Sequence, residues 1–306
     1  MKHFINIKDI SRSKLRKIIL DAKKRKFKRK KLNTLDVDKD SPLKGKLLIQ
    51  MFEKSSTRTR LSFYLAIRQL GGGILTLRTD ELHLAKGESL PDTAKILSTF
   101  GNAFMLRTDN DEKLNQFRKH MKIPIINGLS PSSHPTQILS DVFTIEEIKK
   151  KNISKLNICW IGDSNNVLNS LIEASVKFSF KLNIGCPKKY NPKKSLLSWA
   201  KSNQGRINIF NDPKKAISNA DIVLTDKVVS MNDRVNKQKK KKEFKKFKIT
   251  SKLLKLAPKA YLLHCLPRGD EVSDEVFYGK KSKVWQQALN RVYVQKSILL
   301  YCFDKL

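Results

Sequence analysis

The chain has 306 residues, of which 40% are apolar, and this is enough for two domains that each bury a core. No apolar stretch approaches the roughly 20 residues that a membrane-spanning helix needs. The four cysteines, Cys159, Cys186, Cys265 and Cys302, show no CxxC spacing. This argues against a metal site or a disulfide framework, and it favours a reducing cytoplasm.

The net charge is unusual, because 63 Lys and Arg face 28 Asp and Glu, which gives a formal charge of +35. Such a charge would suit a nucleic-acid-binding protein. However, the lysines are spread along the chain apart from one dense run at 237–248, and no zinc-finger spacing or RNP-type aromatic strand accompanies them. We therefore expect the run to lie on a solvated surface, with no nucleic acid and no membrane as partner. The charge can still attract anionic substrates over a distance.

The N-terminal segment predicts a helix that Asp9 or Ser11 can cap. It lacks the long uncharged core of a secretory signal. Its apolar stripe consists of Leu15, Ile18, Ile19 and Leu20.

Beyond this helix, short apolar runs alternate with amphipathic segments, which is typical of an α/β fold with parallel sheets. The apolar runs predict strands at 46–52, 72–77, 103–106, 123–127, 156–162, 181–186, 207–210, 221–225 and 261–266. The other segments predict helices at 57–70, 90–100, 111–120, 135–150, 166–179, 192–202, 213–218 and 286–300.

A lysine-rich stretch near 146–157 separates two α/β halves. We expect two doubly wound parallel-sheet domains, residues 1–150 and 151–285, with the active site in the cleft between them. A C-terminal helix at about 286–306 should pack back on the first domain.

Polar motifs follow the carboxyl ends of many of these strands, at the edge where open α/β sheets bind ligands. These are EKSSTRTR after 46–52, Arg107 after 103–106, NGLSPSSHPTQ after 123–127, GDSNN after 156–162, TD and SM after 221–225, and HCLPR at the end of 261–266.

The first motif predicts an anion site. Ser55 or Ser56 can cap the helix at 57–70, and the free N–H groups and dipole of a helix start bind phosphate. Ser56, Thr57 and Thr59 add hydroxyl donors, and Arg58 adds a charge that suits phosphate. A purely structural cap needs one hydroxyl, whereas four are present here. The GxxxxGK[ST] pattern is absent, so a nucleoside triphosphate is not indicated.

The remaining motifs are open to two interpretations when taken singly. Pro135 suits the first turn of a helix, so His134 is either a plain cap or a neutral donor to a carbonyl oxygen. Arg107 is either a ligand or a surface arginine. Cys265 is either buried filler or a site residue. GDSNN contains no GxGxxG, so a dinucleotide is not supported.

Together, FEKSSTRTRLSF, HPTQ and HCLPR, in this order, resemble the ornithine carbamoyltransferases of the aspartate/ornithine carbamoyltransferase family, over essentially the whole chain. The aspartate branch would look more like FxEPSTRTR with HPLPR, whereas this chain has Lys54 and Cys265. The resemblance implies that the δ-amine of L-ornithine attacks carbamoyl phosphate and yields citrulline and phosphate. It implies no metal or organic cofactor, and a homotrimer or a higher homo-oligomer of trimers.

The resemblance also implies a role for particular residues. The residues expected to bind carbamoyl phosphate are Ser56, Thr57, Arg58, Thr59, His83, Arg107, His134, Gln137, Cys265, Leu266 and Arg291, with Arg107, His134 and Cys265 as the catalytic ones. Those expected to bind ornithine are Asn166, with Asn165 beside it, Asp226, Ser230 and Met231.

The chain departs from the family pattern at three places. His83 stands where Gln is frequent, Asn232 replaces the glycine of an SMG loop, and the segment after HCLP is short. An alternative acceptor is another amine, such as putrescine or an acylated ornithine. Asp226 and the SM dipeptide argue against it, because they resemble a site for a free amino acid.

Overall fold

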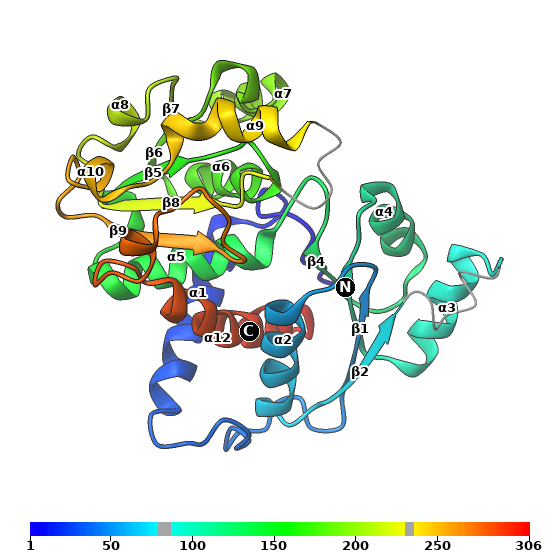
Figure 1. Cartoon of the computed structure of the whole chain (residues 1–306). Coiled ribbons are helices and arrows are strands. Elements are labelled where there is room, and N and C mark those ends of the chain that lie inside the picture. Colours follow the sequence, from blue (N-terminus) through cyan, green and yellow to red (C-terminus); the bar gives the residue numbers. More distant parts are fainter. Residues whose placement is uncertain (79–86, 230–235) are drawn as a thin grey trace. The chain divides into compact units, whose positions relative to one another are not determined.

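Two compact units make up the structure, a computed structural model that describes residues 1–78, 87–229 and 236–306 (Figure 1). Unit 1 comprises Met1–Phe143 and Leu289–Leu306, and unit 2 comprises Thr144–Ala288. Each unit contains one parallel β-sheet with helices. The prediction of two parallel-sheet α/β domains is therefore confirmed.

The sheet of unit 1 has the strand order β2-β1-β3-β4, and all its pairs are parallel. Its strands are β1 (Leu47–Phe52), β2 (Gly73–Arg78), β3 (Ala103–Arg107) and β4 (Ile125–Leu129). The N-terminal segment covers the free edge of β4, because the Phe4 N–H donates to the Ile125 carbonyl and the Asn127 N–H donates to the Phe4 carbonyl. A covered edge cannot pair with another chain.

The helices of unit 1 begin within two residues of their expected starts; the C-terminal helix, expected from 286, begins at Val284. They are α1 (Arg12–Lys28), α2 (Thr57–Gln69), α3 (Leu90–Phe100), α4 (Asp111–His120), the first part of α5 (Pro135–Lys149) and the last part of α12 (Val284–Cys302). Ser11 caps α1 by accepting a hydrogen bond from the Lys14 N–H. Leu20 was expected in the buried stripe but is 56% exposed. Ala22 takes its place, since the helix turns about 100° per residue.

The sheet of unit 2 has the order β7-β6-β5-β8-β9, again with parallel pairs only. Its strands are β5 (Asn157–Ile161), β6 (Lys181–Gly185), β7 (Arg206–Phe210), β8 (Ile222–Asp226) and β9 (Tyr261–Cys265). Its own α-helices are α6 (Asn166–Phe178), α7 (Lys194–Ser202), α8 (Pro213–Ile217), α9 (Lys237–Phe244), α10 (Ser251–Leu254) and α11 (Asp274–Phe277), and short 3₁₀ turns lie at Ile153–Lys155, Lys188–Tyr190 and Lys245–Phe247.

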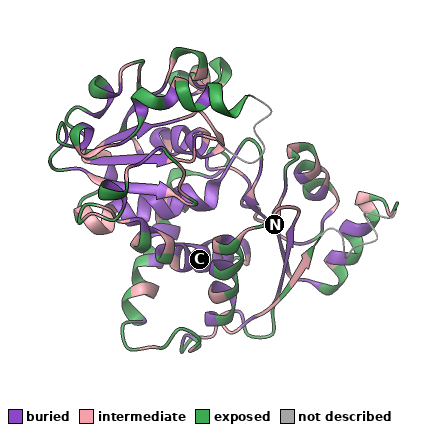
Figure 2. Cartoon of the chain, viewed as in Figure 1, coloured by how far each residue is buried: buried purple, intermediate pink, exposed green. Residues whose placement is uncertain are grey.

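Apolar runs form these strands because a parallel sheet covered by helices is buried on both faces. In β5, residues Ile158–Ile161 are all buried, whereas the edge strands β2 and β7 contain no buried residue (Figure 2). Each predicted strand is present within two residues of its expected bounds. The short helices α10 and α11 were not predicted. No helix in the described part of the chain is long and apolar enough to span a membrane.

The strand order reverses direction once in each sheet. In unit 1 the chain passes from β1 outward to β2 and then returns to β3 on the other side of β1. In unit 2 it passes from β5 outward to β6 and β7, and returns to β8 on the other side of β5. Ligands of open α/β folds bind at such switch points, beyond the carboxyl ends of the strands. These ends carry SSTR and Arg107 in unit 1, and GDSNN and Asp226 in unit 2.

Candidate active-site residues in the two units

The N-terminus of α2 offers donors that its own cap does not use. Ser56 is the N-cap residue, with extended backbone angles, but its side chain makes no capping hydrogen bond. Thr57 is exposed, and Ser56 and Arg58 are half-buried. The first turn contains no acidic residue. The predicted anion site therefore has a free helix start, two accessible hydroxyls and an arginine, which is the donor set that a phosphate group needs.

Glu53, which was not predicted as a site residue, stabilises the end of β1 that leads to α2. Its side chain accepts hydrogen bonds from Lys113 and Thr108. Its backbone N–H donates to the Arg107 carbonyl at 3.0 Å. The end of β1 is thereby joined to the end of β3, and no sequence signal marks Glu53 for this role.

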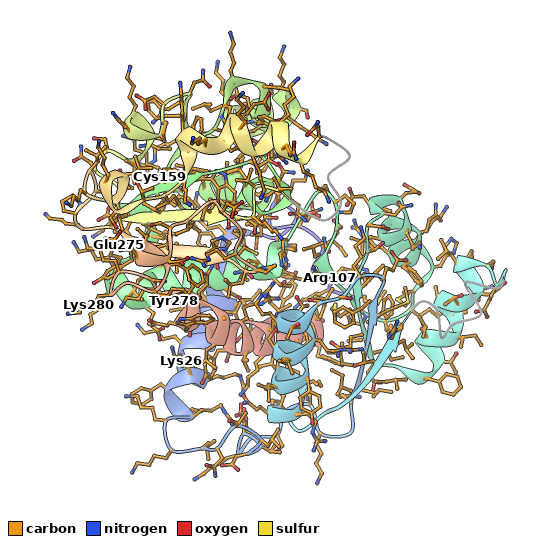
Figure 3. The ribbon with its side chains drawn as sticks, viewed as in Figure 1. Lys26, Arg107, Cys159, Glu275, Tyr278 and Lys280 are labelled. Carbon is orange, nitrogen blue, oxygen red and sulfur yellow. The ribbon has the colours of Figure 1, made fainter. Side chains whose placement is uncertain are left out.

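Arg107 is the last residue of β3, and a local irregularity of the sheet determines its placement (Figure 3). Leu106 pairs with Asn127, but Arg107 pairs with Leu129, so the register shifts and Gly128 is the extra residue of a bulge. A side chain at Gly128 would collide with Met105. Bulges redirect the neighbouring side chains. Here the bulge lies at the half-buried Arg107, at the carboxyl edge of the sheet.

His134 directly precedes α5, whose first residue is Pro135 as predicted. The side chain is buried, with 2% of the residue exposed. Burial lowers the pKa of His134 well below its ordinary value, and the charges of Arg291, Arg107 and Arg58 lower it further. The imidazole is therefore neutral at pH 7, and three arginines of unit 1 act on it electrostatically.

Arg291, on α12, is held by two side chains that were predicted as ligands. Its Nη2 donates to Thr59 Oγ1 at 2.8 Å, and its Nη1 donates to Gln137 Oε1 at 2.9 Å. Gln137 in turn donates to Asp141 Oδ1 at 2.8 Å, and all three of Thr59, Gln137 and Arg291 are buried. The side chains of Thr59 and Gln137 thus position Arg291. The i, i+4 spacing of Gln137 and Asp141 on one helix is a signal that could have indicated this pair.

Asp226 is the last residue of β8 and is half-buried. Its Oδ2 accepts a hydrogen bond from Asn165 Nδ2 at 2.7 Å. Burial raises the pKa of Asp226 to about 6, against the lowering effects of His264 and of the hydrogen bonds from the Lys227 backbone and Asn165. The structure therefore brings GDSNN and Asp226 together, and it makes the carboxylate titratable just below neutral pH.

Asn165 and Asn166 lie at the start of α6. Asn165 is the N-cap residue, and its Oδ1 accepts from the N–H groups of Val167 and Leu168. Its Nδ2 donates to Asp226, so hydrogen bonds hold both the oxygen and the nitrogen of the Asn165 side-chain amide. Asn166 is the first helical residue and is half-buried.

Cys265 and Leu266 lie at the carboxyl end of β9, and both are half-buried. The preceding His264 is buried and its Nε2 lies 2.8 Å from Glu271 Oε1, which also accepts from the Gly269 N–H. A buried histidine–carboxylate pair therefore holds the loop after Cys265. The sequence did not predict this pair, because His264 lies within an apolar run that predicts only a strand.

A pocket of about 710 Å³ adjoins the end of β8 in unit 2. Its lining includes Lys227, which follows Asp226, together with Gly269 and Glu271 from the loop after β9. Side chains of α9 and of the following 3₁₀ turn complete it, among them Phe244 and Phe247. Asp226, Asn165 and Asn166 are not among its lining residues, so the pocket is a neighbour of the predicted amino-acid residues and does not contain them.

Four of the predicted or discussed positions, His83, Ser230, Met231 and Asn232, lie outside the described residues. Within residues 1–78, 87–229 and 236–306, no group of three or more His, Cys, Asp or Glu side chains has the arrangement of a metal site.

The lysine run at 237–248 differs from the prediction at one position. Lys240 is only 3% exposed, although Lys239, Lys241 and Lys242 are exposed. It was expected on the solvated surface, but its ammonium lies 2.6 Å from Asp163 Oδ2. An internal carboxylate is the physical reason, since a lysine is buried only where its charge is paired.

Comparison with known proteins gives a consistent result over both units. Residues 2–147 match the aspartate/ornithine carbamoyltransferase carbamoyl-P binding domain, and residues 154–302 match the Asp/Orn binding domain of the same family. The chain is 41% identical to the ornithine carbamoyltransferase of Brucella suis, with 99% of this chain and 96% of that protein covered. It is also 41% identical to the Rhodopseudomonas palustris ornithine carbamoyltransferase, with 98% and 96% covered.

Solved structures agree with this result. The ornithine carbamoyltransferase of Pyrococcus furiosus superposes with a TM-score of 0.92 at 34% identity, over 100% of this chain and 98% of that one. The anabolic ornithine carbamoyltransferase of Campylobacter jejuni gives 0.89 at 35% identity, over 100% of both chains. The chain therefore belongs to the aspartate/ornithine carbamoyltransferase family.

Proposed function

We propose that the protein is an ornithine carbamoyltransferase, which transfers the carbamoyl group of carbamoyl phosphate to the δ-amine of L-ornithine and releases L-citrulline and phosphate. The observation that carries the choice of acceptor is the likeness, over nearly the whole chain, to relatives named for this activity. Asp226, held by Asn165 beside GDSNN, supports it, because a carboxylate at a strand end suits the ammonium of an amino acid.

Carbamoyl phosphate is assigned to unit 1. The phosphate group accepts hydrogen bonds from the N-terminus of α2, from Ser56 and Thr57, and from Arg58. Arg107 and Arg291 add positive charge, and Thr59 and Gln137 act by holding Arg291 in place. The neutral imidazole of His134 donates to the carbamoyl oxygen, as a charged imidazole would be disfavoured among three arginines. His83 remains a proposed ligand.

Ornithine is assigned to unit 2. Asp226 accepts from its α-ammonium, and Asn166, Ser230 and Met231 complete the proposed contacts. The neutral δ-amine forms a bond to the carbamoyl carbon while the bond from that carbon to the phosphate oxygen breaks. The departing phosphate takes the electron pair and accepts the proton that the attacking amine loses. Donors fixed in advance stabilise the negative charge that develops on the carbamoyl oxygen and on the phosphate. Cys265 and Leu266 are assigned to the reacting centre.

The test is a citrulline assay with carbamoyl phosphate and a panel of amines: L-ornithine, putrescine, N-acetylornithine and L-aspartate. We expect carbamoylation of L-ornithine with a kcat/KM at least about a hundredfold above that of any other amine. Putrescine and N-acetylornithine lack the α-ammonium that the site pairs, and L-aspartate lacks the δ-amine. Carbamoylation of putrescine or N-acetylornithine in preference to ornithine would overturn the choice of acceptor.

We further propose a cytoplasmic homotrimer, or a larger assembly of trimers, that acts in arginine biosynthesis. Exposed apolar side chains on α2 and β2 support self-association: Leu61 is 56% exposed, Tyr64 39% and Leu75 46%. Free cysteines support a reducing compartment. Light scattering on the eluting protein measures the mass of the assembly, and a monomeric mass would contradict the trimer.

A further inference from the structure

Helix α9 contains one lysine whose environment differs from that of its neighbours. The helix has the sequence KQKKKKEF, and its lysines are exposed except Lys240, of which 3% is exposed. Burial of a single lysine in a basic helix requires a specific partner, because an unpaired ammonium away from water is very unfavourable.

That partner is Asp163, in the loop between β5 and α6. Lys240 Nζ donates to Asp163 Oδ2 at 2.6 Å, and it lies 5.6 Å from the centre of the Tyr190 ring. The side chain of Lys240 is 4% exposed and that of Asp163 is 16% exposed. Both charges are shielded from water, so removal of one member deprives a buried charge of this ion-pair partner.

Asp163 belongs to a loop whose other residues are also held. The Asp163 carbonyl accepts from Trp160 Nε1 at 3.2 Å. The hydroxyl of Ser164 donates to the Tyr190 carbonyl, and the Tyr190 hydroxyl donates to Glu243 on α9. The loop at 162–166 is therefore attached to α9 at two points, one through Lys240 and one through Tyr190.

The same loop continues into the residues that contact Asp226. Asn165 lies two positions after Asp163, and its amide bridges the start of α6 and the Asp226 carboxylate, which is 2.7 Å from Asn165 Nδ2. A continuous series of contacts thus leads from Lys240 through Asp163 and Asn165 to Asp226. Small displacements of such a loop are expected to matter at the carboxylate.

We propose that Lys240 is a positioning residue for the amino-acid site: through its ion pair with Asp163, it holds Asn165 and Asn166 in the orientation that binds the acceptor. The inference rests on the proposed function, since it takes ornithine as the ligand of this loop. Lys240 itself does not contact the substrate.

The test compares Lys240→Met with Lys242→Met, which removes the same charge from an exposed position on the same helix. Binding of ornithine is measured by calorimetry in the presence of a stable carbamoyl phosphate analogue, and binding of that analogue is measured alone. We expect Lys240→Met to weaken ornithine binding about tenfold to a hundredfold. Binding of the analogue should change less than about twofold, and Lys242→Met should leave both affinities within about twofold, which is the usual scale for an exposed substitution.

Two further variants separate positioning from general loss of stability. Phe178→Leu makes a cavity in the buried end of α6, so it lowers the unfolding temperature without touching the loop. The affinity for ornithine should stay near the wild-type value in Phe178→Leu. It should be largely retained in Lys240→Arg, which keeps the positive charge that Lys240→Met removes. Asp163→Asn should match Lys240→Met, and the double variant should be no worse than either single one.

Three results would overturn the inference: unchanged ornithine binding in Lys240→Met, equal weakening of both ligands, or the same ornithine defect in Phe178→Leu at a similar unfolding temperature. If the wild-type protein bound the analogue but not ornithine and formed no citrulline, the proposed function itself would fail, and the role of Lys240 would fail with it.

Discussion

Burial shifts the pKa of His134, which we assign to carbamoyl phosphate in unit 1, and that of Asp226, which we assign to the amino acid in unit 2, in opposite directions. In unit 1, burial and three arginines lower the pKa of His134, so an imidazole becomes a neutral donor. In unit 2, burial raises the pKa of Asp226 to about 6, so the carboxylate is still mostly charged at pH 7 but takes up a proton just below it. Loss of water disfavours whichever form is charged.

The difference lies in what surrounds each group. His134 lies among like-signed neighbours that reinforce the effect of burial. Asp226 has an amide donor in Asn165 and the nearby His264, which oppose it. His134 therefore stays neutral at pH values around 7, whereas Asp226 titrates just below that range, near pH 6. The comparison predicts that unit 1 sets the affinity for an anion and unit 2 sets a pH-dependent affinity for an ammonium.

The largest effect is expected from Arg58→Ala, which removes a positive charge at the start of α2. A charge-assisted hydrogen bond contributes about 1.5–3 kcal/mol, and more where it strengthens in the transition state. We expect kcat/KM to fall by at least about a hundredfold, with the far-ultraviolet spectrum and unfolding temperature unchanged. Steady-state kinetics on folded protein provide the measurement. Wild-type kinetics in this variant would contradict the assignment of the phosphate group to Ser56–Arg58.

Asp226→Asn should act on the other substrate. An amide accepts from an ammonium less well than a carboxylate does, so ornithine binding should weaken at least about tenfold, equivalent to roughly 1.4 kcal/mol. Carbamoyl phosphate binding should hold, because the residues assigned to its phosphate group belong to unit 1 and Asp226 is not among the residues assigned to carbamoyl phosphate. Equilibrium binding of each ligand tests this, with ornithine titrated in the presence of a carbamoyl phosphate analogue. Unchanged ornithine binding would make Asp226 structural.

The pH dependence sharpens the comparison further. As pH falls through about 6, the Asp226 carboxylate takes up a proton, so the KM for ornithine should rise while that for carbamoyl phosphate should not. The folded-state pKa lies above the ordinary value, so the folded protein binds this proton more tightly than the unfolded chain does. Protonation of Asp226 therefore stabilises the fold between about pH 6 and pH 4, where it weakens binding. Parallel measurement of KM and of the urea midpoint separates the two. In Asp226→Asn the component of the acid rise in KM that is centred near pH 6 should disappear, and only the steady rise caused by protonation of the δ-amine of ornithine should remain.

The smallest effect is expected when the exposed lysines are neutralised. Lys239→Gln with Lys242→Gln should leave turnover at saturating substrate unchanged, and at low salt it should raise the KM for carbamoyl phosphate less than about twofold, since steering is screened within about 8–10 Å. Stopped-flow association at two salt concentrations measures this. A fall in turnover at saturating substrate would contradict this prediction, because it would mean that these exposed lysines take part in the active site.

Much of the fold follows from local sequence. The runs that form β5, β8 and β9 are short, apolar and free of polar alternation, and a parallel sheet buried on both faces requires that pattern. The capping serine at position 11 and the proline at position 135 mark helix starts for reasons that act within one turn. These elements could be predicted because neighbours in sequence determine them.

The rest of the site depends on contacts that sequence proximity cannot indicate. Gln137 and Arg291 are 154 residues apart, and Lys240 and Asp163 are 77 residues apart. A lysine in a run of lysines gives no local sign that it is the buried one. For the same reason, nothing in the sequence indicated that the Thr59 hydroxyl accepts a hydrogen bond from Arg291, whereas the role of Thr59 as a phosphate ligand stays a prediction. Long-range pairing of polar groups is therefore the part of the site that required the structure.

The division of unit 1 into two pieces has a consequence for synthesis of the chain. Unit 2 is contiguous over Thr144–Ala288, so all of its residues have been made while most of the last helix, α12, is still to come. Unit 1 has to wait for Leu289–Leu306, which bring Arg291 to Thr59 and Gln137, and bring Lys296 to the buried carboxylate of Asp38 at 2.6 Å. Domains fold as units during translation. Unit 1 is therefore made first but cannot complete its fold until residues 289–306 have been made. A shortened chain that stops before Arg291 lacks one of the three arginines that act on His134.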